Sequence, residues 1–440
     1  MKILGSIALF CAIVWGSPAL AIPAFAQQTG QPCSQCHVGA FGPQLKPYGR
    51  DFKVFGYVNG DGKNHAPPVA IIGLISLTKT QAPQSSPPAA HFADNDNVAL
   101  DELNVLYGGK LVAGAGAFAE VTYDGVARSF TIDNLDVKRA FDLSSGDRDL
   151  LVGLDFNNRP TVQDLWNSTP TWGFPYNSSN LAPKPANVTL LDGTLAQRVL
   201  GLGVYGLWND LIYAELTAYA PVNNQLLNRL GVASPAGADS YDGLLPYWRL
   251  AVQHDFGGHY IEAGAFGISG RRFPGGDQSA GVDHIQDVAL DATYQYAPAA
   301  KHFISAHATW IHETDTLDAS RVVSATRAHD HLDTMRADIS YSYDDTWTPS
   351  FQVFKSFGSS DPLFFAGATG RPDSQGYIAE LAFVPFGKNS PKSFISNVRF
   401  TLQWVGYTRF DGVGRGASNN NTLYLSTRFA IAPFSGLVNR

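Results

Sequence analysis

The sequence predicts an all-β protein: a 16-stranded antiparallel outer-membrane β-barrel that follows a short amino-terminal segment. Three observations predict this fold class. From about residue 65 onward, segments of about eight to fourteen residues alternate polar and apolar side chains. The links between these segments are alternately long and short. A secretory leader precedes them and directs the chain out of the cytoplasm.

Residues 1–21 form the expected signal peptide. Met1-Lys2 supplies a positive start, residues 3–15 form a short apolar core, and Ala19-Leu20-Ala21 is a small-residue cleavage site. Ala24-Phe25-Ala26 is an alternative cleavage site. The apolar core is too short to span a bilayer comfortably, so we expect the leader to be removed and not to serve as an anchor.

Composition narrows the classes of function. The chain has a net charge of -7 at pH 7 and a sequence pI near 5.8, which argues against a nucleic-acid partner. Charged residues make up 16%, aromatic residues 12%, and there are 43 glycines. After the leader, no apolar run reaches the roughly 18–20 residues that a transmembrane helix needs. This composition suits a large secreted β protein or an outer-membrane barrel.

The alternating pattern is clear between Thr334 and Tyr343, where polar residues take the even positions and apolar residues the odd positions. A period of two with one charged face is typical of a strand with one face exposed to water. The sequence contains sixteen such segments. They span residues 68–80, 99–111, 115–124, 130–143, 147–157, 197–207, 210–220, 246–256, 258–268, 284–297, 300–312, 330–343, 348–357, 375–385, 394–409 and 421–432.

The links favour a barrel over residues 65–440. Most odd-numbered segments are followed by long links, such as 158–196 and 221–245, and even-numbered segments by short ones, such as 144–146 and 208–209. This asymmetry is typical of periplasmic turns and external loops. A large secreted β-sandwich or propeller is the alternative, with the charged face outside and the aromatic face in the core. The residue pattern alone does not decide which face points outward.

Residues 22–64 carry the motif Cys33-Ser34-Gln35-Cys36-His37, which is typical of covalent haem attachment. Two thiols at this spacing add to the vinyl groups of one porphyrin, and the imidazole of His37 binds the iron as proximal ligand. A structural zinc site would need four ligands, a thioredoxin-like motif would need a βαβ context, and a plain disulfide leaves His37 unexplained. We therefore predict one haem c. A segment this short cannot bury it alone, so we expect a plug in the barrel mouth or lumen.

The sequence identifies the distal iron ligand and the propionate partners less specifically than the attachment motif. Met335, the one methionine after the leader, lies in a segment whose alternation points it outward. His65 and His91 flank the first strand and are candidates for the distal iron ligand, although each is equally a loop histidine. Arg50 and Lys53 are candidate partners for the anionic haem propionates, or solvated charges on a short helix.

Two further sets of residues have two interpretations each. The first would pack on the porphyrin or form an ordinary helix core, and it consists of Tyr48, Phe52 and Phe55. The second would attract a metal cation into the lumen or form the polar face of the strands, and it consists of Glu215, Asp291, Asp338 and Glu380.

Several fixed positions surround the haem motif: Pro23-Ala24-Phe25-Ala26, Gln28-Thr29-Gly30, Phe41, Leu45, Tyr48-Gly49-Arg50, Phe52-Lys53 and Gly56-Tyr57. Together with the motif they resemble the amino terminus of the fused monohaem cytochrome–porins of iron-oxidising bacteria. The resemblance covers residues 22–57 by motif and the remainder by architecture. It implies an outer-membrane Fe(II) oxidase in which one haem plugs a sixteen-stranded porin. The partners it implies are extracellular Fe(II), a periplasmic electron carrier and outer-membrane lipid.

We therefore expect an oxidoreductase-like electron conduit in the outer membrane. Two other classes of function stay open at this point. One is a porin whose haem-bearing plug gates or senses the passage of a solute. The other is a haem redox enzyme such as a peroxidase, with an open position on the iron.

Overall fold

The protein is described from a computed structural model, which covers residues 23–60, 68–223, 229, 239–388 and 396–433. The signal peptide predicted over residues 1–21 and the candidate ligand His65 lie outside the described residues. No helix in the described part of the chain combines the length and apolar character needed to cross a membrane.

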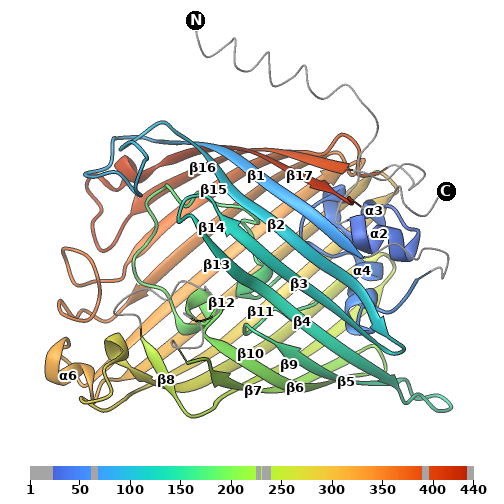
Figure 1. Ribbon diagram of the computed structural model, residues 1–440, viewed down its shortest axis with the longest axis horizontal. Helices are drawn as coiled ribbons and strands as arrows, with labels where there is room; N and C mark the ends of the chain where they lie inside the picture. The colour runs from blue at the N-terminus through green and yellow to red at the C-terminus, as the bar shows by residue number, and fades with distance from the viewer. Residues whose placement is uncertain (1–22, 61–67, 224–228, 230–238, 389–395, 434–440) are drawn as a thin grey trace, which may run out of the picture.

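The described strands form one closed antiparallel sheet (Figure 1). β17 returns to pair with β1, with Ile71 opposite Ile431, and this pairing closes the barrel. β8 and β9 lie one after the other along the same side of β10 and act as a single stave. The 17 strands of the described chain therefore make a barrel of 16 staves, and the predicted fold class is confirmed.

The strand bounds are β1 Val69–Thr80, β2 Asn97–Val112, β3 Ala115–Asp124, β4 Ser129–Asp142, β5 Leu150–Asn157, β6 Val199–Trp208, β7 Ile212–Pro221, β8 Ser240–Asp242, β9 Leu245–Phe256, β10 His259–Phe273, β11 Asp283–Ala299, β12 His302–Thr316, β13 His329–Tyr343, β14 Trp347–Gly358, β15 Ser374–Phe383, β16 Ser396–Arg409 and β17 Thr422–Ile431.

The apolar face of the strands points outward and the polar face points into the lumen. In β13, Ile339 is 51% exposed, whereas its neighbour Ser340 is 1% exposed. The same alternation leaves Leu216 65% exposed on β7 and Glu215 buried. A soluble sandwich would show the opposite arrangement, because water would face the charged side. An apolar exterior on a closed sheet is what lipid requires. The barrel is therefore built to lie in an outer membrane, as predicted.

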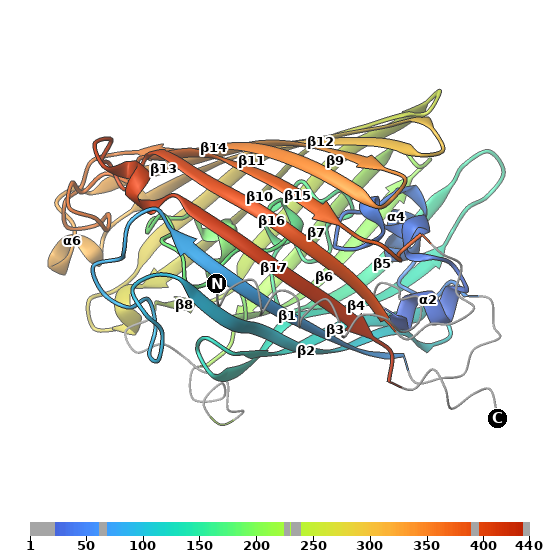
Figure 2. The ribbon, with the colours of Figure 1, turned by 90° about the horizontal axis from the view of Figure 1, so that it is seen from above.

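The two ends of the barrel differ. Links at one end are short, as at residues 113–114, 257–258 and 300–301, and links at the other end are long, as at 81–96 and 317–328. Figures 1 and 2 show α2 (Pro23–Thr29) and α4 (Pro47–Val54) at the short-turn end and α6 (Ser320–Val323) at the opposite end. In outer-membrane barrels the short turns face the periplasm. The amino-terminal helices therefore occupy the periplasmic mouth.

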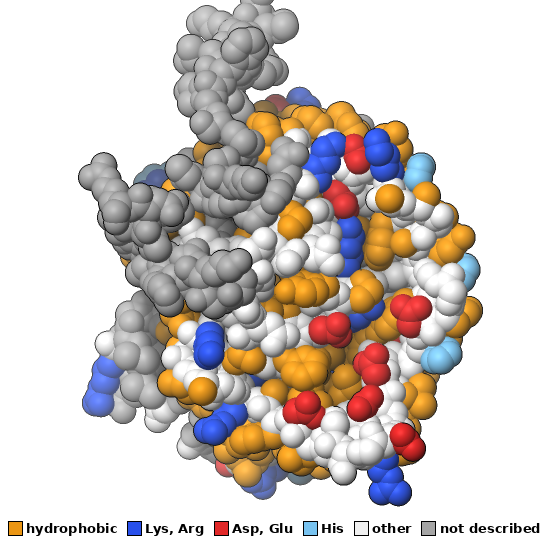
Figure 3. Space-filling model, turned by 90° about the vertical axis from the view of Figure 1, so that its right-hand side faces the viewer, with side chains coloured by type: hydrophobic (Ala, Val, Ile, Leu, Met, Phe, Trp, Pro, Cys, Tyr) orange, Lys and Arg blue, Asp and Glu red, His pale blue; other side chains and the backbone are white. Residues whose placement is uncertain are grey.

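The amino-terminal segment packs inside this mouth as a plug, which we define as residues 23–60. Its buried Phe52 and Tyr57 join one apolar cluster with Ile72 and Leu106 of the barrel wall. α4 begins at Pro47, a residue well suited to the first helical position because its missing N–H has no partner there in any case. In Figure 3, which looks onto this end, described side chains close over the part of the mouth that grey atoms leave visible.

Candidate functional site

The Cys33–His37 motif is held by a short hairpin within the plug. Cys33–Cys36 forms the single helical turn α3, and the amide of His37 donates to the Cys33 carbonyl at 2.8 Å. His37 then pairs with Leu45 in an antiparallel bridge, and the amide of Lys46 donates to the Cys36 carbonyl at 2.8 Å. Gly49 lets α4 approach this turn, because a Cβ at that position would lie 2.6 Å from the Cys36 oxygen. Backbone hydrogen bonds within the plug therefore fix the position of the motif.

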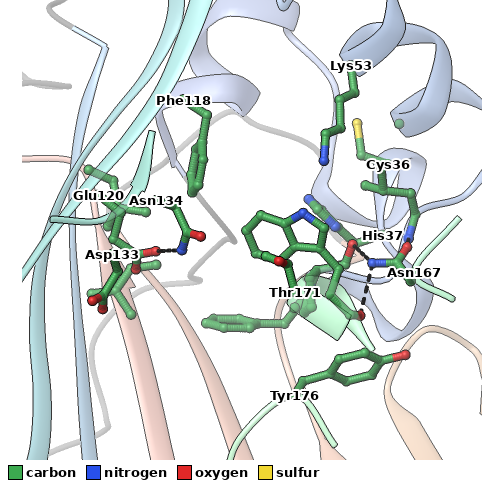
Figure 4. A pocket seen from close by; sticks show the side chains of 18 of the residues that line it. Cys36, His37, Lys53, Phe118, Glu120, Asp133, Asn134, Asn167, Thr171 and Tyr176 are labelled. Carbon is green, nitrogen blue, oxygen red and sulfur yellow. Dashed lines mark hydrogen bonds between the residues drawn. The ribbon is translucent and has the colours of Figure 1, made fainter. Parts of the chain in front are cut away.

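A cavity of about 370 Å³ opens beside the motif, between the plug and the barrel wall. This volume lies within the range of about 300–1,000 Å³ that is usual for small-molecule and cofactor sites. Cys36 and His37 line it on one side, and Figure 4 shows Glu120, Asp133 and Asn134 on the opposite side. Its apolar lining comes from the plug, the wall and a long loop: Phe25, Phe41, Phe52, Leu106, Phe118 and Trp172.

The chemistry of the motif suits iron ligation and thioether formation. Burial lowers the pKa of His37 to about 4, the ammonium of Lys46 adds to the lowering, and the nearby Gln44 carbonyl opposes both. The imidazole is therefore neutral at pH 7, which is the form that binds a metal. Its Nδ1 atom is buried and makes no hydrogen bond to a described residue. Cys33 and Cys36 are not joined by a disulfide. These residues fit a covalently attached haem.

Of the two predicted propionate partners, the structure brings only Lys53 to the cavity. Lys53 lines it, and its Nζ donates to the carbonyls of Val162 and Asp164, at 2.7 Å each. Arg50 points away: its guanidinium lies 3.7 Å from the centre of the Tyr260 ring and donates to Gln295 Oε1 at 2.6 Å. The two side chains are three residues apart on α4, yet they meet different parts of the wall. Arg50 is a structural anchor of the plug.

Two arginines that the sequence did not single out reach the cavity. Arg159 lies in the loop after β5, and Arg428 lies on β17, where it pairs with Glu102 at 2.9 Å. Arg159 forms no ion pair within the described residues. These guanidiniums are better placed than Arg50 to meet anionic propionates. They were missed because they are 122 and 391 positions after His37 in the chain.

The other predicted iron ligands do not meet the motif in the described structure. His91 lies in the link 81–96, at the end of β1 remote from the plug (Figure 1). The cavity beside the motif reaches Ile72 of β1. The eight residues from Ile72 to the end of β1, at about 3.3 Å each, separate this cavity from the link by roughly 25 Å. His91 is therefore excluded as the distal ligand. Met335 is 42% exposed on the outer face, as its alternation predicts.

Of the three aromatic residues predicted to pack on a porphyrin, one lines the cavity and two do not. Phe52 lines the cavity. Phe55 instead packs against the apolar cluster that contains Val54 and Tyr205, on another side of the plug. Tyr48 is not part of the lining. Phe25, Phe41 and Tyr57 line the cavity together with Phe52.

The link between β5 and β6, predicted as an external loop, folds into the lumen (Figure 1). We call residues 158–198 the inner loop. Its Asn167 accepts from the Leu45 amide at 2.8 Å and donates to the Pro43 carbonyl at 2.9 Å, so that it binds the plug directly. Trp166 and Phe174 of this loop are each 1% exposed. This aromatic content is unusual for a solvated loop, and it was the available signal that the link is buried.

The inward carboxylates hold the inner loop and wall and do not form an open cation site. Asp291 pairs with Arg249 at 2.6 Å, and Glu380 with Arg399 at 2.6 Å. Asp338 hydrogen-bonds to His307 at 2.9 Å. Among the described residues, no group of three or more His, Cys, Asp or Glu side chains is arranged to hold a metal ion. The prediction that these carboxylates face the lumen is nevertheless confirmed by their burial.

Comparisons with known proteins concern the barrel. No family model matches the chain, and no curated protein matches it. Its fold is that of an outer-membrane β-barrel. Similar solved structures include Salmonella typhi OmpF in complex with daunomycin, at 12% identity over 82% of this chain and 97% of that chain, with a TM-score of 0.47. An anion-selective porin from Comamonas acidovorans matches at 12% identity, 82% and 98% coverage and a TM-score of 0.44. In-vitro folded OmpT of Vibrio cholerae matches at 10% identity, 82% and 97% coverage and a TM-score of 0.43. What the site does is therefore argued from this chain's own residues.

Proposed function

We propose that the protein is an outer-membrane electron conduit. In this proposal a haem c attached to Cys33 and Cys36 and ligated by His37 takes electrons from an extracellular donor and gives them to a periplasmic carrier. One observation carries the proposal: the attachment motif borders a cofactor-sized cavity inside the periplasmic mouth of a membrane-spanning barrel. The haem would supply reversible one-electron chemistry at its iron.

The filled lumen supports a conduit more than a solute channel. The plug packs inside the periplasmic mouth, and the inner loop lies in the lumen behind it with buried side chains such as Trp166 and Leu181. A lumen of sixteen staves would otherwise leave an aqueous passage. Hydrated solutes need an open path through the lumen, which the inner loop obstructs.

The chain's own residues have distinct tasks in this proposal. His37 would supply the axial nitrogen, and Lys53, Arg159 and Arg428 would neutralise the propionates. Apolar side chains around the cavity would keep water from the porphyrin and hold its plane in one orientation. The periplasmic location of the plug leaves the haem close to the compartment where a soluble carrier would take the electron.

Fe(II) as the external donor rests on the resemblance of residues 22–57 to the cytochrome–porins of iron-oxidising bacteria. The test uses the full-length protein purified from outer membranes. A pyridine haemochrome spectrum should show one haem c per chain, and anaerobic Fe(II) should reduce it. Absence of covalent haem would overturn the conduit. Covalent haem that Fe(II) leaves oxidised would overturn the donor alone.

A second candidate is a porin whose plug gates the passage of a solute. The barrel is of the porin type, and the plug is a separate segment fastened in its mouth by discrete contacts such as Lys46 to Asp345 at 2.8 Å. Liposome swelling separates the two candidates. Holoprotein that admits sugars would favour the porin, and a sealed holoprotein would favour the conduit. A high-spin spectrum with peroxide turnover would instead favour a haem redox enzyme.

A further inference from the structure

A second cavity, of about 380 Å³, lies on the other side of the inner loop from the motif. One wall consists mainly of lumen-facing residues of β13 to β17, and the other consists of the inner loop. Pro175 lines both cavities, so a single chain segment separates them. Cys33, Cys36, His37 and His91 do not line this second cavity.

Its barrel wall carries a patch of apolar and aromatic side chains among polar ones. Phe354, Ile378, Val405 and Tyr407 are lumen-facing residues of three adjacent strands. The register places Ile378 directly opposite Val405. Gly376, between Phe354 and Tyr407 across the sheet, leaves room for the Phe354 ring, because a Cβ there would lie 2.7 Å from it. An apolar patch inside a hydrated lumen is typical of a binding site.

The inner-loop wall also contributes apolar side chains, and three polar side chains of the lining already donate hydrogen bonds to the inner loop. Phe174, Pro175, Pro183 and Val188 of the inner loop line it. The polar side chains between the walls bind the protein itself. Gln352 Nε2 donates to the Phe174 carbonyl at 2.6 Å, Gln403 Nε2 to the Asn177 carbonyl at 3.0 Å, and the Tyr407 hydroxyl to the Pro183 carbonyl at 3.3 Å. The cavity therefore offers a ligand aromatic rings and aliphatic faces.

Three cations line the cavity: Lys184, Arg336 and Lys355. Lys355 holds an exposed, outward position of β14, and its Nζ lies 4.6 Å from the centre of the Phe357 ring, so it does not face a ligand between the two walls. Arg336 is neutralised by Asp192 at 2.5 Å. Lys184 donates to Asn180 Oδ1 at 3.1 Å and forms no ion pair within the described residues. The carboxylates of Asp101, Asp124 and Glu102 act on Lys184 only from beyond ion-pairing distance. An acidic group on the ligand would meet this ammonium.

We propose that the second cavity binds a flat aromatic molecule that carries an acidic group. Aromatic and proline faces on both walls suit a planar ring system, and Lys184 selects the anion. The size of the cavity fits a molecule of two or three fused rings. This inference goes beyond the proposed electron conduit and does not depend on haem.

The test is isothermal titration of the full-length protein in lipid nanodiscs with naphthalene-2-sulfonate, and with 2-naphthol as the uncharged probe. Wild type should bind one sulfonate per chain. Phe354→Ala should weaken binding of both probes about tenfold through loss of one aromatic face. Phe351→Ala is the matched control: Phe351 is 45% exposed on the lipid-facing side of the same strand and should leave binding unchanged.

Two further variants separate shape from charge. Ile378→Trp should fill the cavity and abolish binding, while Lys184→Gln should weaken the sulfonate about tenfold and spare 2-naphthol. Heat-modifiable mobility on electrophoresis confirms that each barrel is folded, and Lys184→Gln carries the test if the core variants fail to fold. Equal effects of Phe354→Ala and Phe351→Ala would overturn the proposal, as would a sulfonate affinity that Lys184→Gln leaves unchanged. Because the readout is heat of binding, failure here is independent of haem content.

Discussion

Asn167 fastens the inner loop to the plug, and its replacement should free the plug without opening the barrel. Its side chain is 2% exposed and makes hydrogen bonds to the Leu45 amide and the Pro43 carbonyl. Asn167→Gly leaves both groups partly buried and unpaired. At about 1–2 kcal/mol for each, the docked state should lose about 2–4 kcal/mol. This corresponds to a roughly 30- to 900-fold rise in plug opening.

Asn167→Ala should cost about 1 kcal/mol more than the glycine variant. Asn167 has a φ of 63°, and glycine holds this left-handed conformation without the steric penalty that alanine meets. The comparison therefore separates the lost hydrogen bonds from backbone strain.

Hydrogen exchange at the Leu45 amide measures the opening directly. Asn187→Gly is the control, because Asn187 lies in the same loop and also makes two hydrogen bonds, both to Ala366 and away from the plug. It should leave Leu45 protection within about threefold of wild type. Unchanged protection in Asn167→Gly, with a folded barrel, would refute the view that this residue anchors the plug.

The remaining predictions concern the cavity. Burial lowers the pKa of Lys53 from 10.5 to about 8. Between these two values the undocked segment binds more protons than the docked one, so the protease resistance of the haem-free plug should rise from about pH 8 to 10. Lys53→Met should remove this pH dependence, and a flat wild-type profile would contradict the prediction. His37→Ala should retain thioether-bound haem but lose the axial nitrogen, seen as a Soret shift that added imidazole reverses; an unshifted spectrum would exclude His37 as the ligand. Arg159→Gln should lower the haem midpoint potential on the order of tens of millivolts, because a nearby cation favours the reduced form, while the exposed Arg139→Gln should leave it unchanged.

The sequence predicts the strands well because the alternation of side chains reflects the two media that each strand contacts. Each strand faces lipid on one side and the lumen on the other, and the period of two appears within the strand itself. The segment predicted over 115–124 is β3 as observed, and the last segment differs from β17 by one residue at each end. Link lengths also indicated which end faces the periplasm. The Cys33–His37 motif is equally local, since its five residues need no distant partner to be recognised.

Only the tertiary structure decided what fills the lumen and which side chains reach the cavity. The inner loop, Arg159 and Arg428 come to the plug from distant parts of the chain, and no sequence period records their meeting. Arg50 and Lys53 lie on one helix with the same charge, yet Arg50 stacks on Tyr260 and Lys53 lines the cavity. The reason is physical: alternation is set by the medium on each face of a strand, whereas packing inside the barrel is set by complementarity between segments brought together only when the sheet closes.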